Sequence, residues 1–251
     1  MIHEKHIFTQ IIIKMDKMPN KKIVITNTII CSVLFVLGFL VSTINVNQTY
    51  LTVNAPLANG SRNTDQVAIM FIIDDPTMAD NLTPILETLA RAETRATFFF
   101  TGAAAINNLE LLQTIATNHE LGNYGFSNTA LNVADKNFIT EEIQLADTLI
   151  NSLVHTTMDI FTPPMGLFNK HTLAMAQNLG YTTVLPTDRN VVIDWDNADS
   201  NLVLSYAIYQ VQAGDIIALK PTAATRQCFP QIMTNYLANN LKVTSLGHLL
   251  P

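Results

Sequence analysis

Short apolar segments alternate with segments of helical periodicity from about residue 66 onward, and this alternation limits the fold more than any other feature. Val67–Ile73 is a run of seven apolar residues, which is typical of a strand buried on both faces. Residues 78–91 then carry leucines and isoleucines at intervals of three and four, the spacing of one helix face. The repetition of this pattern predicts parallel strands joined by helices, either as an open sheet or as a barrel.

The same reasoning predicts the strands and helices of the whole domain and the strand ends at which functional residues should lie. Strands are expected at Val67–Ile73, Ala96–Thr101, His119–Tyr124, Asp159–Thr162, Tyr181–Leu185, Gly214–Leu219 and Lys242–Leu246. Helices are expected at 78–91, 104–117, 141–153, 171–179, 201–211 and 228–237. In parallel α/β folds, functional residues lie at the carboxyl ends of the strands.

Composition excludes several classes of protein. The formal net charge is -6, from 14 basic and 20 acidic residues, which argues against a nucleic-acid partner because phosphates require a basic surface. Two cysteines exclude a disulfide-stapled scaffold and a cysteine-rich zinc module. With 48% hydrophobic residues, the chain is too apolar to be disordered.

The charge is distributed unevenly around one apolar segment. Residues 1–22 carry five lysines and two acidic residues, whereas residues 23–46 carry no charge and as a helix would extend about 36 Å. That length suffices for a hydrocarbon core of about 30 Å. We therefore expect a single-pass anchor with its N-terminus in the cytoplasm and the domain outside it. A cleaved signal peptide, and hence a secreted domain, is the alternative because the densest apolar part, residues 29–41, is short.

Four parts follow from this division: a basic cytoplasmic tail (1–22), a transmembrane signal anchor (23–46), a linker (47–65) and a folded domain (66–251). The linker is assigned from its Asn, Thr, Gly and Ser content. Glycosylation sequons begin at Asn47, Asn59 and Asn81 and matter only in a eukaryotic source.

A pair of carboxylates, Asp74 and Asp75, directly follows the first strand. Adjacent carboxylates suit a metal ligand beside a general base, since one binds the ion while the other takes a proton from its water. A simple turn built from Asp-Asp-Pro is the alternative.

Five segments lie at or next to the expected strands: Val67–Asp75, Ala96–Gly102, Asn118–Tyr124, Phe161–Gly166 and Gly214–Leu219. In this order they resemble polysaccharide deacetylases of the NodB-homology type. The resemblance covers nearly all of residues 66–251. It implies a distorted (β/α)7-type barrel that acts on N-acetylated polysaccharides such as chitin or peptidoglycan.

The resemblance also implies roles for particular residues. Members of this family hydrolyse an acetamide with a divalent metal such as zinc, held by one Asp and two His, and a late His protonates the leaving amine. By this resemblance Asp74 falls on the base position and Asp75 on the carboxylate ligand. The ligand histidines are replaced by Tyr124 and Asn128, and the acid histidine by Lys220.

These replacements change the expected chemistry. A phenol with a pKa near ~10 and a neutral amide are poor zinc ligands, so we expect no cofactor. An unperturbed lysine, with a pKa of about 10.4, is a weaker acid than histidine. We expect the ammonium of Lys220 to pair with Asp74 or Asp75 in place of the lost cation.

The remaining positions of the implied site form a substrate pocket. The family's arginine before Pro-Pro is Thr162 here, and the following aromatic residue, whose N–H helps to hold an oxyanion, is Met165. The glycine that usually follows the two aspartates is Pro76. Trp195 resembles a family tryptophan that lines the acetyl pocket, although core packing explains it equally well. The pocket expected from the resemblance comprises Thr162, Pro163, Pro164, Met165, Asp194, Trp195 and Leu219.

Substitution at the strand ends, with the strand pattern intact, favours a membrane-anchored, deacetylase-like protein that has lost catalysis and binds a glycan or serves in the cell envelope. The alternative is an active hydrolase of N-acetyl amide bonds with an atypical site. A third possibility is a pure interaction module without glycan affinity.

Overall fold

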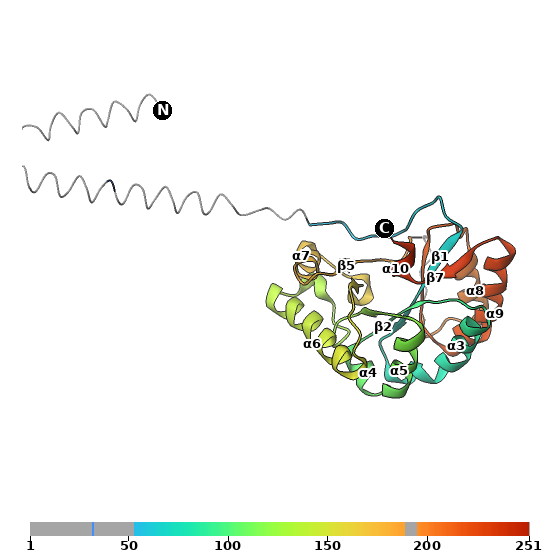
Figure 1. Cartoon of the computed structure of the whole chain (residues 1–251), viewed down its shortest axis with the longest axis horizontal. Coiled ribbons are helices and arrows are strands. Elements are labelled where there is room, and N and C mark those ends of the chain that lie inside the picture. Colours follow the sequence, from blue (N-terminus) through green and yellow to red (C-terminus); the bar gives the residue numbers. More distant parts are fainter. Residues whose placement is uncertain (1–31, 33–52, 189–194, 251) are drawn as a thin grey trace, which may run out of the picture. The chain divides into compact units, whose positions relative to one another are not determined.

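The computed structural model describes residues 53–188 and 195–250, together with Ser32. The compact unit that contains the sheet begins at Val53. It is a curled, parallel α/β half-barrel with helices packed around the outside of a seven-stranded sheet (Figure 1). The expected span at 23–46 lies outside the described residues apart from Ser32. Within the part of the chain that the structure describes, no helix is long and apolar enough to cross a membrane.

All seven expected strands are present and pair in parallel, most of them with shorter ends than the sequence predicts. They are β1 (Gln66–Ile73), β2 (Thr97–Phe100), β3 (Glu120–Asn123), β4 (Ile160–Phe161), β5 (Thr182–Thr183), β6 (Ile216–Leu219) and β7 (Lys242–Thr244). Their order is β5-β4-β3-β2-β1-β6, and β7 pairs with the first residues of β1. Because β5 and β6 end this path, the sheet is a curled half-barrel, which is consistent with the distorted (β/α)7-type barrel that the resemblance implies.

The helices differ from the expected ones mainly at their N-termini. They are α3 (Leu82–Arg91), α4 (Gly102–Ile106), α5 (Leu109–Asn118), α6 (Lys136–Val154), α7 (Lys170–Asn178), α8 (Ser200–Ile208), α9 (Ala223–Ala238) and α10 (Leu246–Leu249). Short 3-10 turns lie at η1 (Pro76–Asn81), η2 (Leu131–Val133) and η3 (Pro164–Gly166).

Two of the expected helices are interrupted. The one expected at 78–91 becomes α-helical only at Leu82, because Pro76–Asn81 forms a 3-10 turn capped by the Asp75 side chain. The one expected at 104–117 is divided into α4 and α5, since Asn107 and Asn108 both bond back to carbonyls of α4. Both interruptions come from short-range polar contacts that apolar periodicity does not report.

The strand β1 carries the core because both of its faces are buried. Its alternate residues Val67, Ile69, Phe71 and Ile73 belong to the cluster between sheet and helices. The residues between them, Ala68, Met70 and Ile72, belong to a second cluster inside the curl of the sheet, which also includes Leu246 and Leu249 of α10. This period-two division is the one that a continuous apolar strand predicts.

Candidate functional site

The expected site residues follow three strands at the same edge of the sheet. Asp74 and Asp75 follow β1, and Lys220 follows β6, which pairs with β1 with Phe71 opposite Leu219. Tyr124 and Asn128 come after β3. Since all these strands are parallel, their carboxyl ends meet at one edge.

Lys220 forms an ion pair with Asp74, one of the two carboxylates expected as its partner. The ammonium nitrogen Nζ lies 2.5 Å from Oδ2 of Asp74. The Asp74 side chain is only 6% exposed and that of Lys220 is 23% exposed, so the pair is largely withdrawn from water. The side-chain amide of Asn128 donates to the same carboxylate oxygen at 3.2 Å. A fixed cation and an amide donor therefore hold the carboxylate that the resemblance assigns as the base.

Asp75 is engaged in its own turn and does not bind Lys220. Its Oδ1 accepts hydrogen bonds from the hydroxyl of Thr77 at 2.7 Å and from the Thr77 backbone N–H at 2.8 Å. These bonds lower the pKa of the Asp75 carboxyl, with a smaller contribution from the charge of Lys220. The alternative considered for the two aspartates was a simple Asp-Asp-Pro turn. It accounts for the Asp75 side chain, which bonds within that turn.

Tyr124 fills the space beside the ion pair. Its side chain is buried, and its hydroxyl oxygen accepts the backbone N–H of Met165 at 2.9 Å. Burial raises the pKa of this phenol to about 12, so it stays protonated at neutral pH. Met165 lies in the left-handed region (φ 58°), and the residue is 57% exposed. The Met165 backbone donor is therefore already bonded within the chain.

Glu142 of α6 positions the loop that carries Asn128. Glu142 is 5% exposed, and its carboxylate accepts the backbone N–H groups of Phe126 at 3.0 Å and Ser127 at 2.9 Å. It also accepts the Ser127 hydroxyl at 2.8 Å. Asn128, one residue further, has a left-handed backbone (φ 53°). Sequence reasoning missed Glu142, although a glutamate inside an apolar helix face was an available signal.

The donor set does not fit a zinc ion. A zinc site needs three or four imidazole, thiolate or carboxylate ligands. Among the described residues no cluster of three or more His, Cys, Asp or Glu could hold a metal. The buried oxygens Asp74 Oδ1 and Asn128 Oδ1 have no hydrogen-bond partner among the described residues, but together they offer one charge, which an ammonium already balances. Lys220 supplies the cation at this edge.

The expected pocket residues divide into two groups. Thr162, Pro163, Pro164 and Leu219 are buried at the strand ends, whereas Met165 is exposed. Trp195 is half-buried and packs edge-to-face on Tyr206 of α8, with ring centroids 5.9 Å apart. This is the core-packing explanation considered for Trp195. Asp194 lies outside the described residues.

His119 is a structural histidine next to β3. Its ring lies 5.1 Å from that of Phe98, and its Nδ1 accepts the Ala96 N–H in a long bond of 3.4 Å. Burial, and then the charge of Arg95, lower its pKa from 6.5 to about 4. The folded chain thus binds fewer protons than the unfolded chain between these two pH values.

We predict a stability loss on acidification that depends on His119. The stabilisation is fully present above pH 6.5 and is lost as the pH falls through about 4. His119→Gln should remove about 1–2 kcal/mol of this pH-dependent loss, because the partly exposed ring is screened by solvent. Urea unfolding at pH 7 and pH 4.5 measures it, with the exposed His248→Gln variant as the control. Equal losses in the wild type and the His119 variant would contradict this assignment.

A sequence model of the family described as "Polysaccharide deacetylase" matches residues 61–184. The chain is a divergent member of the polysaccharide deacetylase family. The matched range contains the two aspartates, Tyr124 and Asn128, and ends before Lys220.

Curated relatives are about 25% identical to this chain over the parts that align. An uncharacterised protein of Bacillus subtilis, YlxY, is 25% identical over 68% of this chain and 54% of its own length. A peptidoglycan-N-acetylglucosamine deacetylase of Bacillus cereus is 25% identical over 58% of this chain and 67% of its length. Chitin deacetylase 1 of Cryptococcus neoformans is 24% identical over 61% of this chain and 31% of its own length. The chain thus spans about half the length of the first of these relatives.

Solved structures confirm the fold of the family. A CE4 family pseudoenzyme from Bacillus anthracis superposes with a TM-score of 0.73 at 24% identity, covering 78% of this chain and 69% of that one. A peptidoglycan N-acetylglucosamine deacetylase gives a TM-score of 0.70 at 20% identity, and the match covers 78% of this chain and 92% of that one. The half-barrel is therefore that of the polysaccharide deacetylases.

Proposed function

We propose that this chain is a membrane-anchored, extracytoplasmic deacetylase-like protein that does not catalyse and instead binds glycan or serves in the cell envelope. The observation that carries the proposal is the ion pair between Lys220 and Asp74. The carboxylate at the base position is thereby paired with a fixed ammonium in a largely buried setting.

This arrangement opposes amide hydrolysis at two steps. A general base needs an oxygen that can reach the proton of an attacking water, but Lys220 and Asn128 both donate to Oδ2 of Asp74, and its Oδ1 is buried. A general acid must deliver a proton to the leaving amine. Lys220 stands at that position with its ammonium bound to the carboxylate. The group at the base position and the group at the acid position are thus bound to each other.

The ligand and the location are part of the proposal. Relatives named as peptidoglycan and chitin deacetylases support an N-acetylated polysaccharide as the partner. The uncharged segment 23–46, with lysines before it, supports a single membrane anchor with residues 66–251 outside the cytoplasm. Cleavage after this segment would instead give a secreted protein with the same domain.

The test combines metal analysis, an acetate-release assay and a glycan pull-down on the purified full chain. We expect no stoichiometric zinc or cobalt, no acetate from chito-oligosaccharides or peptidoglycan fragments, and retention on at least one of these glycans. Stoichiometric metal with turnover that Asp74→Asn abolishes would establish the active hydrolase instead. Absence of metal, turnover and glycan retention together would favour the interaction module.

A further inference from the structure

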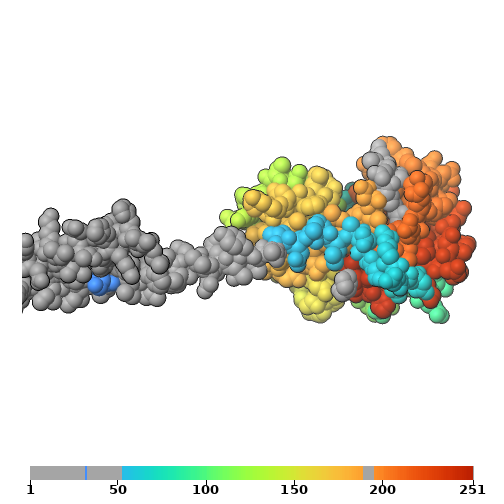
Figure 2. Space-filling view, turned by 90° about the horizontal axis from the view of Figure 1, so that it is seen from above, coloured from blue at the N-terminus to red at the C-terminus, as the bar shows by residue number. Residues whose placement is uncertain are grey.

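Leu57–Arg62, which we call the strap, lies across the gap between β5 and β6. Its first residue donates to the carbonyl of Thr183 and accepts the N–H of Leu185, both at 2.9 Å. On the other side, Gly60 donates to the carbonyl of Gly214 at 2.7 Å. Figure 2 shows the segment around the strap as a continuous cyan band across one face of the domain. The strap thus bridges the two ends of the open sheet, inside the segment expected to be a linker.

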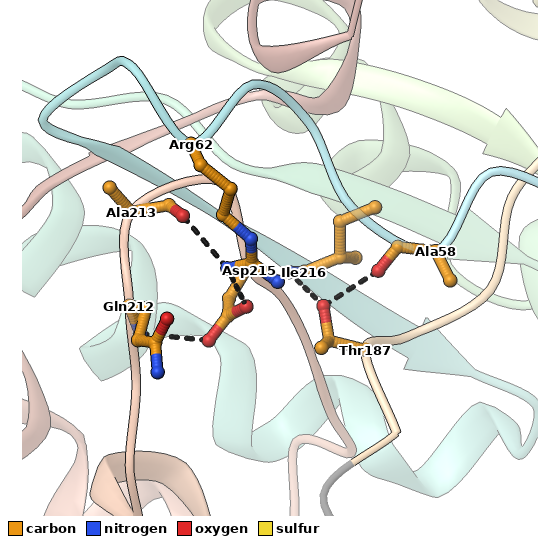
Figure 3. A network of polar contacts seen from close by, with 7 residues as sticks. All are labelled: Ala58, Arg62, Thr187, Gln212, Ala213, Asp215 and Ile216. Atoms are coloured by element: carbon orange, nitrogen blue, oxygen red, sulfur yellow. Dashed lines mark hydrogen bonds and ion pairs between the residues drawn. The ribbon is translucent and has the colours of Figure 1, made fainter.

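An ion pair fastens the end of the strap. Nη1 of Arg62 lies 2.5 Å from Oδ1 of Asp215 and donates to the carbonyl of Ala213 at 2.8 Å (Figure 3). The other carboxylate oxygen accepts the Gln212 N–H at 2.8 Å. The Asp215 side chain is 4% exposed, whereas that of Arg62 is 46% exposed. The pair therefore joins an accessible cation to a buried carboxylate in the turn before β6.

A threonine hydroxyl joins the strap to both neighbours. The Thr187 hydroxyl donates to the carbonyl of Ala58 at 2.7 Å and accepts the Ile216 N–H at 2.9 Å (Figure 3). The loop after β5, the strap and the first residue of β6 thus share one hydroxyl group.

The strap is held by polar contacts and not by core burial. None of residues 53–65 is buried, whereas Val67–Ile73 are all buried. Segments with few buried apolar contacts open at lower free energy than the core. We propose that the strap is a detachable closure of the half-barrel, latched by Arg62 and Asp215, which opens before the core unfolds. Opening would uncover the backbone groups at the edges of β5 and β6.

The strap connects the N-terminal part of the chain to the domain. The strap immediately follows residues 1–56 and continues directly into β1. A pulling force applied N-terminal to the strap would therefore load the contacts across the gap between β5 and β6 before it reached β1. The inference is independent of whether the domain binds a glycan.

Amide hydrogen exchange on the full chain tests the proposal. In Arg62→Ala, and separately in Thr187→Val, exchange at Leu57, Gly60 and Leu185 should quicken by about tenfold or more, while the amides of β1 keep their rates. Lys242→Ala is the matched control, because it removes an exposed ion pair with Asp65, which lies in the chain just after the strap.

Three results would overturn the proposal. One is exchange of the strap and β1 amides at a common rate in the wild type, which would make them a single opening unit. Another is a change of less than about twofold at the strap amides in both variants. The third is an equal acceleration in Lys242→Ala, which would show that any nearby charge loss has the same effect.

Discussion

Lys220→Met is expected to lower the free energy of unfolding by about 3 kcal/mol, among the largest single effects in the domain. The reason is the burial of its partner: the Asp74 side chain is 6% exposed, and Asn128 would remain as its single hydrogen-bond donor. A buried carboxylate that loses its cation keeps its desolvation cost without the compensating attraction. Urea unfolding at pH 7, monitored by circular dichroism, measures the change.

A double-mutant cycle separates this mechanism from loss of side-chain packing. Asp74→Asn combined with Lys220→Met removes both charges, so it should recover most of the stability that Lys220→Met loses. Lys242→Met is the matched control, because its pair with Asp65 is 72% and 51% exposed and should matter little. If the double variant is as unstable as Lys220→Met alone, the ion pair does not explain the effect.

The ion pair could be expected because the family resemblance places Asp74 or Asp75 and Lys220 in one site, and because the rule for parallel strands brings residues after the strands to one edge. Once Val67–Ile73 and Gly214–Leu219 are taken as parallel strands, the residues that follow them must end at one edge. The expected strands were found for the same reason, since burial on both faces leaves a run of apolar residues. Apolar patterns therefore predicted the sheet and the position of its functional edge.

The remaining features depend on polar contacts between residues far apart in the chain. Nothing in the sequence indicates that the strap bonds to residues after β5 and before β6, because its composition resembles that of any linker. The contact of Tyr124 with the Met165 N–H depends in the same way on the backbone geometry of a strained loop. Hydrogen bonds of this kind carry no periodic signal.

The second large effect is a gain of metal binding. Tyr124→His together with Asn128→His should raise the affinity for zinc by at least about a hundredfold, since two neutral imidazoles join the carboxylate of Asp75. Adding Lys220→Met should raise it further, by about tenfold or more, because an ammonium beside the site repels a divalent ion. Isothermal titration with zinc measures both steps.

Tyr124→Phe with Asn128→Ala serves as the control for the disruption of the site itself. It removes the bonds to Met165 and Asp74 without adding a ligand, so zinc affinity should stay at the wild-type level. Equal zinc binding by this control and the histidine variant would place the ion elsewhere on the chain. A folded histidine variant without added affinity would mean that these positions do not converge on Asp75. A gain that needs both histidines would show that the half-barrel keeps the geometry of a metal site and lacks only its ligands.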